Sequence, residues 1–163
     1  MSGTCLNLDL AGNIGWSLFS PPTDPPTPPR FGSHNWRGEG APAILGKFGD
    51  WLSDFYMVSP WDAMAWEEPW LQPGDKVEKM KILIGLPAIC LAFANSRRHP
   101  MPFVTVTPKE VKKRMTGRQD AEKVDVIDAC WKIGWKVKTS DEADACGVGL
   151  VSYRRIWPRP VPA

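Results

Sequence analysis

Residues 4–19 read TCLNLDLAGNIGWSLF, and this stretch decides how the fold begins. Between positions 4 and 10, leucines alternate with smaller or polar residues, which predicts a strand with one apolar face. Leu6, Leu8 and Leu10 share that face, and Cys5, Asn7 and Asp9 share the other. The Ala-Gly-Asn sequence that follows is a turn signal, and residues 15–19 predict a second strand that completes a hairpin.

Beyond the hairpin, the apolar pattern predicts one more strand and then helices that alternate with strands. Strands are predicted at 31–37, 62–67 and 103–106, and helices at 41–56, at 77–95, from 108, at 121–133 and from about 141. Thr107 and Glu110 form a capping box around Pro108 at the start of one helix. This order predicts an α/β fold: a mixed five-stranded sheet, with three antiparallel strands and then parallel additions, flanked by helices.

The chain has 163 residues, of which 43% are hydrophobic and 23% are charged. This composition is typical of a folded globular protein and excludes a disordered one. The length fits one domain, so we expect residues 1–163 to form a single domain. Residues 20–30 hold six prolines and predict an exposed hairpin loop, with an SH3-type ligand as the alternative, and residues 156–163 form a tail.

The four cysteines, at positions 5, 90, 130 and 146, lie in apolar or helical contexts without C-x-x-C spacing. We interpret them as reduced core residues of an intracellular protein. The first residues lack the pattern of a signal peptide, and no run of 18 apolar residues predicts a membrane span. Nine tryptophans against two tyrosines predict a tryptophan-rich core with some rings that cover it.

Four carboxylates occupy positions from which their oxygens can converge. Asp9 lies in the first strand, Glu67 ends the buried strand at 62–67, and Asp141 and Asp144 are three residues apart at a predicted helix start. Such a cluster repels itself unless a cation fills it, and oxygen ligands favour Mg²⁺ or Mn²⁺. Two such ions can drive phosphodiester cleavage. Taken singly, each carboxylate can instead be a solvated strand-end residue or a helix-capping residue.

The charge is unevenly distributed along the chain. Residues 1–75 carry three basic and nine acidic residues, a net charge of −6, whereas residues 76–123 carry eleven and four, a net charge of +7. Residues 124–163 have a net charge of +1, so the total of +2 conceals a basic central segment. A basic segment beside clustered carboxylates attracts a polyanion such as nucleic acid, although a solvated lysine-rich helix has the same composition.

Four segments resemble RuvC-type Holliday junction resolvases of the RNase H-like superfamily, in the same order. They are LNLDLAGNIGWSLF, AMAWEEPW, VTPKEVKKRMTGRQDAEKVDVIDA and SDEADACGVGL, which lie within residues 4–151. The resemblance implies an RNase H-like nuclease fold. The proline-rich loop, the tail and the extra acid Glu68 are departures that suggest a divergent phage or viral branch.

The resemblance also implies roles for single residues. Asp9, Glu67, Asp141 and Asp144 match catalytic metal ligands, which would hold two Mg²⁺ or Mn²⁺ ions. Lys112 and Lys123 match basic residues that contact DNA near the scissile phosphate, within a basic segment that includes Lys109, Lys113, Arg114 and Arg118. Trp70 matches an aromatic residue that stacks on a base at the junction centre. An exposed aromatic ring there is a platform for unpaired bases, and a ring folded back onto the core is the alternative.

The function implied is a metal-dependent endonuclease that cuts branched DNA, with Holliday junctions as its substrate. Two symmetric cuts suit a homodimer, which in such enzymes forms through the long helix, here at about 77–95. A broader nuclease for flaps and forks, a junction-binding module without turnover, and an RNA–DNA hybrid nuclease are the alternatives. His34 and His99 receive no role.

Overall fold

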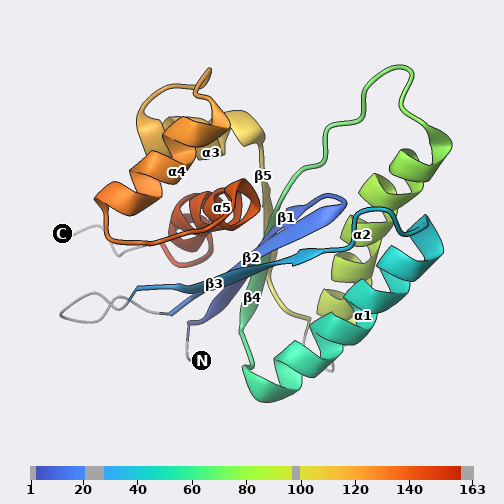
Figure 1. The fold of residues 1–163 in the computed structure, drawn as a ribbon. Coiled ribbons are helices and arrows are strands. Elements are labelled where there is room, and N and C mark those ends of the chain that lie inside the picture. The colour runs from blue at the N-terminus through green and yellow to red at the C-terminus, as the bar shows by residue number, and fades with distance from the viewer. Residues whose placement is uncertain (1–2, 21–27, 97–99, 159–163) are drawn as a thin grey trace.

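A five-stranded mixed sheet forms the centre of the molecule in the computed structural model, which describes residues 3–20, 28–96 and 100–158 (Figure 1). The strand order is β3-β2-β1-β4-β5. The pairs β1–β2 and β2–β3 are antiparallel, and β1–β4 and β4–β5 are parallel. The predicted α/β sheet, with its antiparallel meander and parallel additions, is therefore confirmed.

The elements follow one another in the predicted order. The strands are β1 (Cys5–Leu10), β2 (Asn13–Phe19), β3 (Arg30–Asn35), β4 (Ala63–Glu67) and β5 (Phe103–Val106). The helices are α1 (Ala41–Val58), α2 (Val77–Asn95), α3 (Pro108–Thr116), α4 (Lys123–Lys132) and α5 (Ser140–Ile156). The capping box is present, since the Thr107 side chain accepts from the Glu110 N–H at 3.3 Å while Glu110 accepts from the Thr107 N–H at 2.7 Å.

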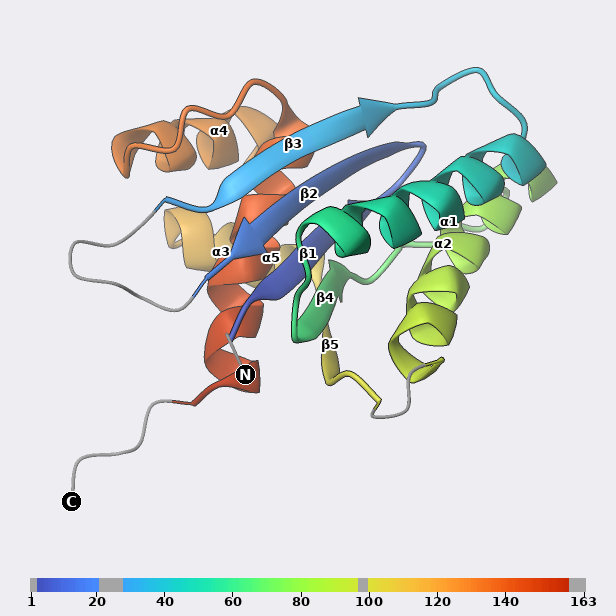
Figure 2. The same cartoon turned by 90° about the horizontal axis from the view of Figure 1, so that it is seen from below.

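Helices cover both faces of the sheet: α1 and α2 lie on one side, and α3, α4 and α5 on the other (Figures 1 and 2). The leucines at positions 6, 8 and 10 pack towards α1 and α2 with Phe48, Trp61 and Trp66. The opposite face of the sheet carries smaller residues, including Cys5, Ala63 and Ala65, which pack with Val111 of α3 and Val148 of α5. The alternation along β1 thus separates a bulky aromatic layer from a close-packed one.

Several boundaries differ from the predictions. Strand β2 begins at Asn13 rather than at 15, because the turn is confined to Ala11 and Gly12. Strand β3 spans Arg30–Asn35 rather than 31–37, and α1 continues to Val58. Most of the predicted proline-rich loop, residues 21–27, and residues 159–163 of the tail lie outside the described residues, while Ile156 still belongs to α5.

The four cysteines are buried and free, as predicted for reduced core residues. Trp61 and Trp66 are 2% exposed, and Trp16, Trp36 and Trp51 pack at the edge of the same core. Among the described residues, no helix has the length and apolar character needed to cross a membrane.

Candidate active site

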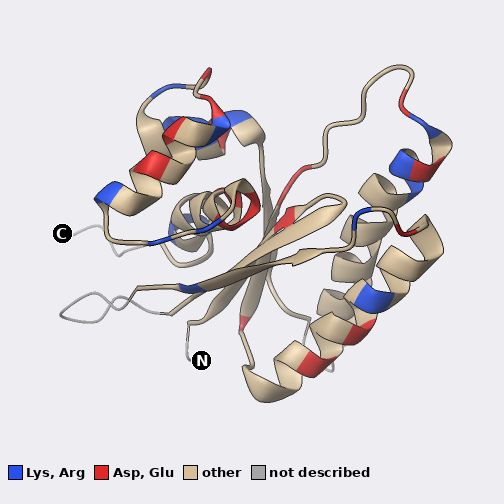
Figure 3. Cartoon of the chain, viewed as in Figure 1, with Lys and Arg blue, Asp and Glu red and all other residues tan. Residues whose placement is uncertain are grey.

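Three elements that are far apart in the sequence bring the four predicted carboxylates to one edge of the sheet. Leu8 of β1 pairs with Trp66 of the parallel strand β4, so Asp9 and Glu67 are the next residues on neighbouring strands. Both lie on the face that α5 covers, because they share the parity of Cys5 and Ala63. Asp141 and Asp144 come from the first turns of α5. In Figure 3, the acidic segments of β1, of the end of β4 and of the start of α5 lie next to one another.

The four carboxylates line one pocket of about 320 Å³. Its other lining residues are Ala11, Gly12, Asn13, Arg37, Pro108, Lys112, Lys123 and Val126. The acidic wall thus faces a basic one, with cations from the segment after β3, from α3 and from the start of α4. This arrangement can attract a phosphate group to a site that the carboxylates alone would repel.

Burial and mutual repulsion raise the carboxylate pKa values. The pKa of Asp9 lies well above its usual value, first because of burial and then because of the charges of Glu67, Asp144 and Asp141. Burial, with the Asp144 charge, raises the pKa of Glu67 to about 7, against the opposing effect of Lys112 and Lys123. Burial likewise raises the pKa of Asp144 to about 6. A set of carboxylates held together against their own repulsion is typical of a cation site.

The residues present fit a hard divalent cation. The donors are carboxylate oxygens, which Mg²⁺ and Mn²⁺ prefer. A further oxygen, Oδ1 of Asn13, is buried without a hydrogen-bond partner, while Nδ2 of the same side chain donates to Oδ2 of Asp141 at 3.4 Å. In the described part of the chain, no three Asp, Glu, His or Cys side chains are already grouped around one ion position. The structure therefore shows a shared carboxylate pocket rather than a preassembled coordination shell.

A second pocket adjoins the first and is lined by three of the predicted DNA-contacting residues. Trp70 and Lys109 line it with Glu68, Pro69, Leu71, Thr107 and Gln119, and its volume is about 680 Å³. Lys112 and Pro108 line both pockets. Trp70 is 70% exposed and so does not fold back onto the core. The indole face is therefore accessible beside the carboxylates.

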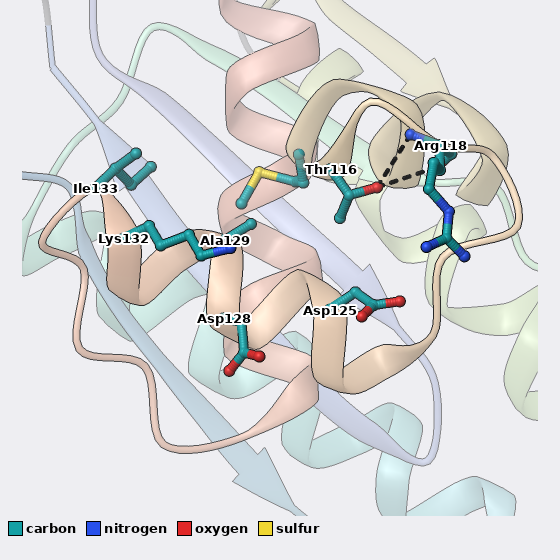
Figure 4. Close-up of a pocket in the computed structure, with 8 residues that line it drawn as sticks. Thr116, Arg118, Asp125, Asp128, Ala129, Lys132 and Ile133 are labelled. Atoms are coloured by element: carbon teal, nitrogen blue, oxygen red, sulfur yellow. Dashed lines mark hydrogen bonds between the residues drawn. The ribbon is translucent and has the colours of Figure 1, made fainter.

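The rest of the predicted basic segment lies elsewhere. Arg118 lines a separate pocket of about 360 Å³ between α3 and α4, with Asp125 and Asp128 (Figure 4). Its guanidinium pairs with Asp120 at 3.2 Å. In that close-up the Thr116 hydroxyl accepts from the Arg118 N–H and donates to the Arg118 carbonyl. Lys113 and Arg114 are exposed and line neither the carboxylate pocket nor the Trp70 pocket.

Two polar residues of the carboxylate pocket were not predicted from the sequence: Asn13 and Arg37. The signal for Asn13 is its place in the hairpin, because Asp9 pairs with Gly15 and Asn13 shares the face of Gly15. Arg37 follows β3, whose Asn35 pairs with Asn13. Knowledge of the strand pairing would therefore have found both residues.

The fold has known counterparts, although the sequence matches no protein-family model and no curated protein. Thermus thermophilus RuvC aligns with a TM-score of 0.62 and 16% identity, over 94% of this chain and 95% of that one. RuvC of T. thermophilus in complex with a Holliday junction substrate gives a TM-score of 0.68 and 18% identity over the same shares. The yeast mitochondrial Holliday junction resolvase Ydc2 gives 0.62 and 15%, over 92% of this chain and 77% of that one. The chain therefore has the RuvC-like fold, as its four sequence segments predict.

Proposed function

We propose that this protein is a metal-dependent, structure-selective endonuclease for branched DNA, with the Holliday junction as its preferred substrate. The observation that carries the proposal is the single pocket in which four carboxylates from β1, β4 and α5 face Lys112 and Lys123. This pocket lies in a fold shared with proteins that are named as Holliday junction resolvases. A protein that only binds phosphate gains nothing from four acids beside it.

Asp9, Glu67, Asp141 and Asp144 would hold Mg²⁺ or Mn²⁺, two ions per site. When bound, divalent cations supply an activated water near neutral pH and neutralise charge on the leaving oxygen of a phosphodiester. Lys112 and Lys123 draw the phosphate towards the carboxylates, whose own charge would repel it. The products would carry 5′-phosphate and 3′-hydroxyl ends.

The DNA path would run from the carboxylate pocket into the Trp70 pocket, since Lys112 lines both. Lys112 and Lys109 would contact phosphates, and the exposed Trp70 ring would stack on an unpaired base at the branch point. Lys113, Arg114, Arg118 and Lys123 would extend the contact with the backbone. A branched substrate fits because its centre offers bases that are already partly unstacked.

The active assembly would be a homodimer that places two sites on one junction. Helix α2 supports this with exposed apolar residues: Val77 is 68% exposed and Ile84 is 55% exposed. Both line an apolar groove that α1 and α2 form together. We place the dimer contact on α2. A single nuclease domain at 1–163 and an intracellular location, which the free cysteines support, complete the proposal.

The test is cleavage of three synthetic DNAs of matched sequence: a four-way junction, a flap and a Y-fork, each with Mg²⁺. We expect the four-way junction to be cut fastest, by paired symmetric nicks, and Asp9→Asn to abolish cleavage while it retains junction binding. Faster cleavage of the flap or fork would assign the broader nuclease instead. Binding without cleavage by the wild type, together with no Mg²⁺ binding in calorimetry, would assign a junction-binding module.

A further inference from the structure

One face of β2 lies against α5, the helix that carries Asp141 and Asp144. The residues of that face are Asn13, Gly15, Ser17 and Phe19, which alternate along the strand. Each of them contacts α5, at Asp141, Asp141, Ala145 and Gly149 in turn. We call these four residues of β2 the seating face.

The closest of these contacts is at Gly15. A Cβ atom at this position would overlap the backbone carbonyl of Asp141, so only glycine lets the start of α5 lie this close to the strand. Gly15 is also the β2 residue that pairs with Asp9 of β1. The same backbone position therefore faces one predicted metal ligand across the hairpin and supports the helix turn that carries another.

The other contacts repeat along the helix. The Ser17 hydroxyl, which is fully buried, donates to the carbonyl of Ala145 at 2.8 Å. One turn further, the Phe19 ring fills the space that a Cβ on Gly149 would need. At the other end, the Asn13 amide donates to Asp141 at 3.4 Å. The four contacts are thus an amide hydrogen bond, a close backbone approach, a buried hydroxyl hydrogen bond and an aromatic ring packed against a glycine.

The spacing of the two elements matches. Two residues along a strand advance by about 6.6–6.8 Å, and four residues along a helix advance by about 6 Å. The distance from Gly15 to Ser17 to Phe19 along β2 is therefore similar to the distance from Asp141 to Ala145 to Gly149 along α5. Because these contacts are close and one of them is a buried hydrogen bond, α5 cannot slide or rotate on the sheet without a clash or an unpaired buried hydroxyl.

We propose that the seating face of β2 sets the position of α5 and thereby aligns Asp141 and Asp144 with Asp9 for cation binding, so that Gly15 and Ser17 are positioning residues. This inference rests on the proposed cation-dependent function. Neither residue touches the cation or the DNA in this proposal. They act through the helix.

The experiment measures Mn²⁺ affinity by calorimetry, without DNA, for Gly15→Ala, Ser17→Ala and Ser17→Thr. Gly32→Ala is the matched control: Gly32 also lies in the sheet, and a Cβ there would come 2.8 Å from the Trp16 ring, on the face away from α5. We expect Gly15→Ala to weaken Mn²⁺ binding by about 10–100-fold, the usual cost when a group that orients metal ligands is lost. Ser17→Ala should weaken Mn²⁺ binding several-fold. Ser17→Thr, which keeps the hydroxyl, and Gly32→Ala should both bind Mn²⁺ with wild-type affinity.

Amide hydrogen exchange gives a second readout that needs neither cation nor DNA. Exchange in the first two turns of α5 should rise in Gly15→Ala and Ser17→Ala but not in Gly32→Ala. Wild-type Mn²⁺ affinity in both Gly15→Ala and Ser17→Ala, or an equal loss in Gly32→Ala, would overturn the proposal. If the wild type binds Mn²⁺ but cuts no branched DNA, the nuclease proposal fails and the seating face stands; if it binds no Mn²⁺, both fail.

Discussion

The two faces of the sheet are packed in different ways. Towards α1 and α2, the contacts are made by large rings: Trp16, Trp51 and Phe55 lie with ring centroids 4.8–6.4 Å apart. Towards α5, the sheet presents mostly small or polar residues, with the Phe19 ring packed against Gly149. Two hydroxyls make buried hydrogen bonds there: Ser17 to the Ala145 carbonyl and Ser152 to Oδ1 of Asn7. The two faces of the sheet therefore hold their helices by different kinds of contact.

A layer of large side chains buries much apolar area but allows small shifts, because rings can tilt to fill space. A close backbone approach with directed hydrogen bonds buries less area and holds a helix more exactly in place. The α1 and α2 face is thus suited to stability, and the α5 face to the alignment of carboxylates. Substitutions on the two faces should therefore change different properties.

The largest expected effect is a loss of stability, and it tests whether the α1 and α2 face provides stability rather than alignment. Phe48 is fully buried in the aromatic layer, so Phe48→Ala should lower the free energy of unfolding by about 3–5 kcal/mol. Urea unfolding measures this loss. The cleavage rate per folded molecule should stay at the wild-type level, and a large loss of rate in the folded fraction would show that alignment is not confined to the α5 face.

At the carboxylates we expect the opposite result, a loss of cleavage rate without a loss of stability. Glu67→Gln should reduce the cleavage rate of the four-way junction by about 10²–10³-fold, the loss typical of one removed electrostatic group in an active site. Its free energy of unfolding should not fall, because burial and the Asp144 charge both disfavour the ionised glutamate. The matched comparison is Glu68→Gln, next along the chain but exposed, which we expect to change the rate by less than about tenfold.

The pH dependence of stability gives a smaller effect with a definite sign. The folded pKa of Glu67 is about 7, against its usual value of 4.5, so the folded protein binds more protons than the unfolded chain between these values. The contribution of Glu67 to stability is therefore lost as pH rises from about 4.5 to about 7, on the order of 2 kcal/mol in the cation-free protein.

Urea unfolding of the wild type and Glu67→Gln at several pH values checks this. The two should be equally stable near pH 4.5, and Glu67→Gln should be the more stable above pH 7. Saturating Mn²⁺ should stabilise the wild type there, since binding to the folded state adds to its stability. Equal stability of the two proteins across the range would contradict the origin given for the raised pKa.

The smallest effect concerns DNA affinity alone. Trp70 is 70% exposed, so Trp70→Ala should leave the unfolding free energy within about 0.5 kcal/mol of wild type. Its affinity for a four-way junction should fall roughly tenfold, as expected for one lost base–aromatic stack. Trp131→Ala is the control, since Trp131 is 53% exposed on α4 and should keep wild-type junction affinity in the same fluorescence-anisotropy titration.

Sequence reasoning recovers the fold well where patterning and local signals agree. The long helix at 77–95 and the strand at 103–106 are predicted with their observed bounds, because each is bracketed by turn residues or by the Thr107 capping box. The second strand is predicted two residues short, since Asn13 is a turn-forming residue that here already pairs with Asn35. Local preference and strand pairing disagree at that position, and pairing prevails.

The site is recovered only in part, for a related reason. The four carboxylates are predicted from their places on strands and helices, and they do share one pocket. Arg37 and Asn13 reach the pocket only through the pairing of β1, β2 and β3, which no local spacing reveals. Arg118 belongs to the basic segment by sequence but turns towards Asp120, because a nearby carboxylate competes for it.

The pocket also has a consequence for how the protein is made. It joins Asp9 of β1 to Asp141 and Asp144 of α5, two elements that are far apart in the sequence. Contacts over such distances in the chain form late, after the loop-closure entropy has been overcome. A nascent chain that has emerged only as far as α4 presents Asp9 and Glu67 without their partners. The proposed nuclease would therefore be inactive until α5 has been synthesised and has packed against the sheet.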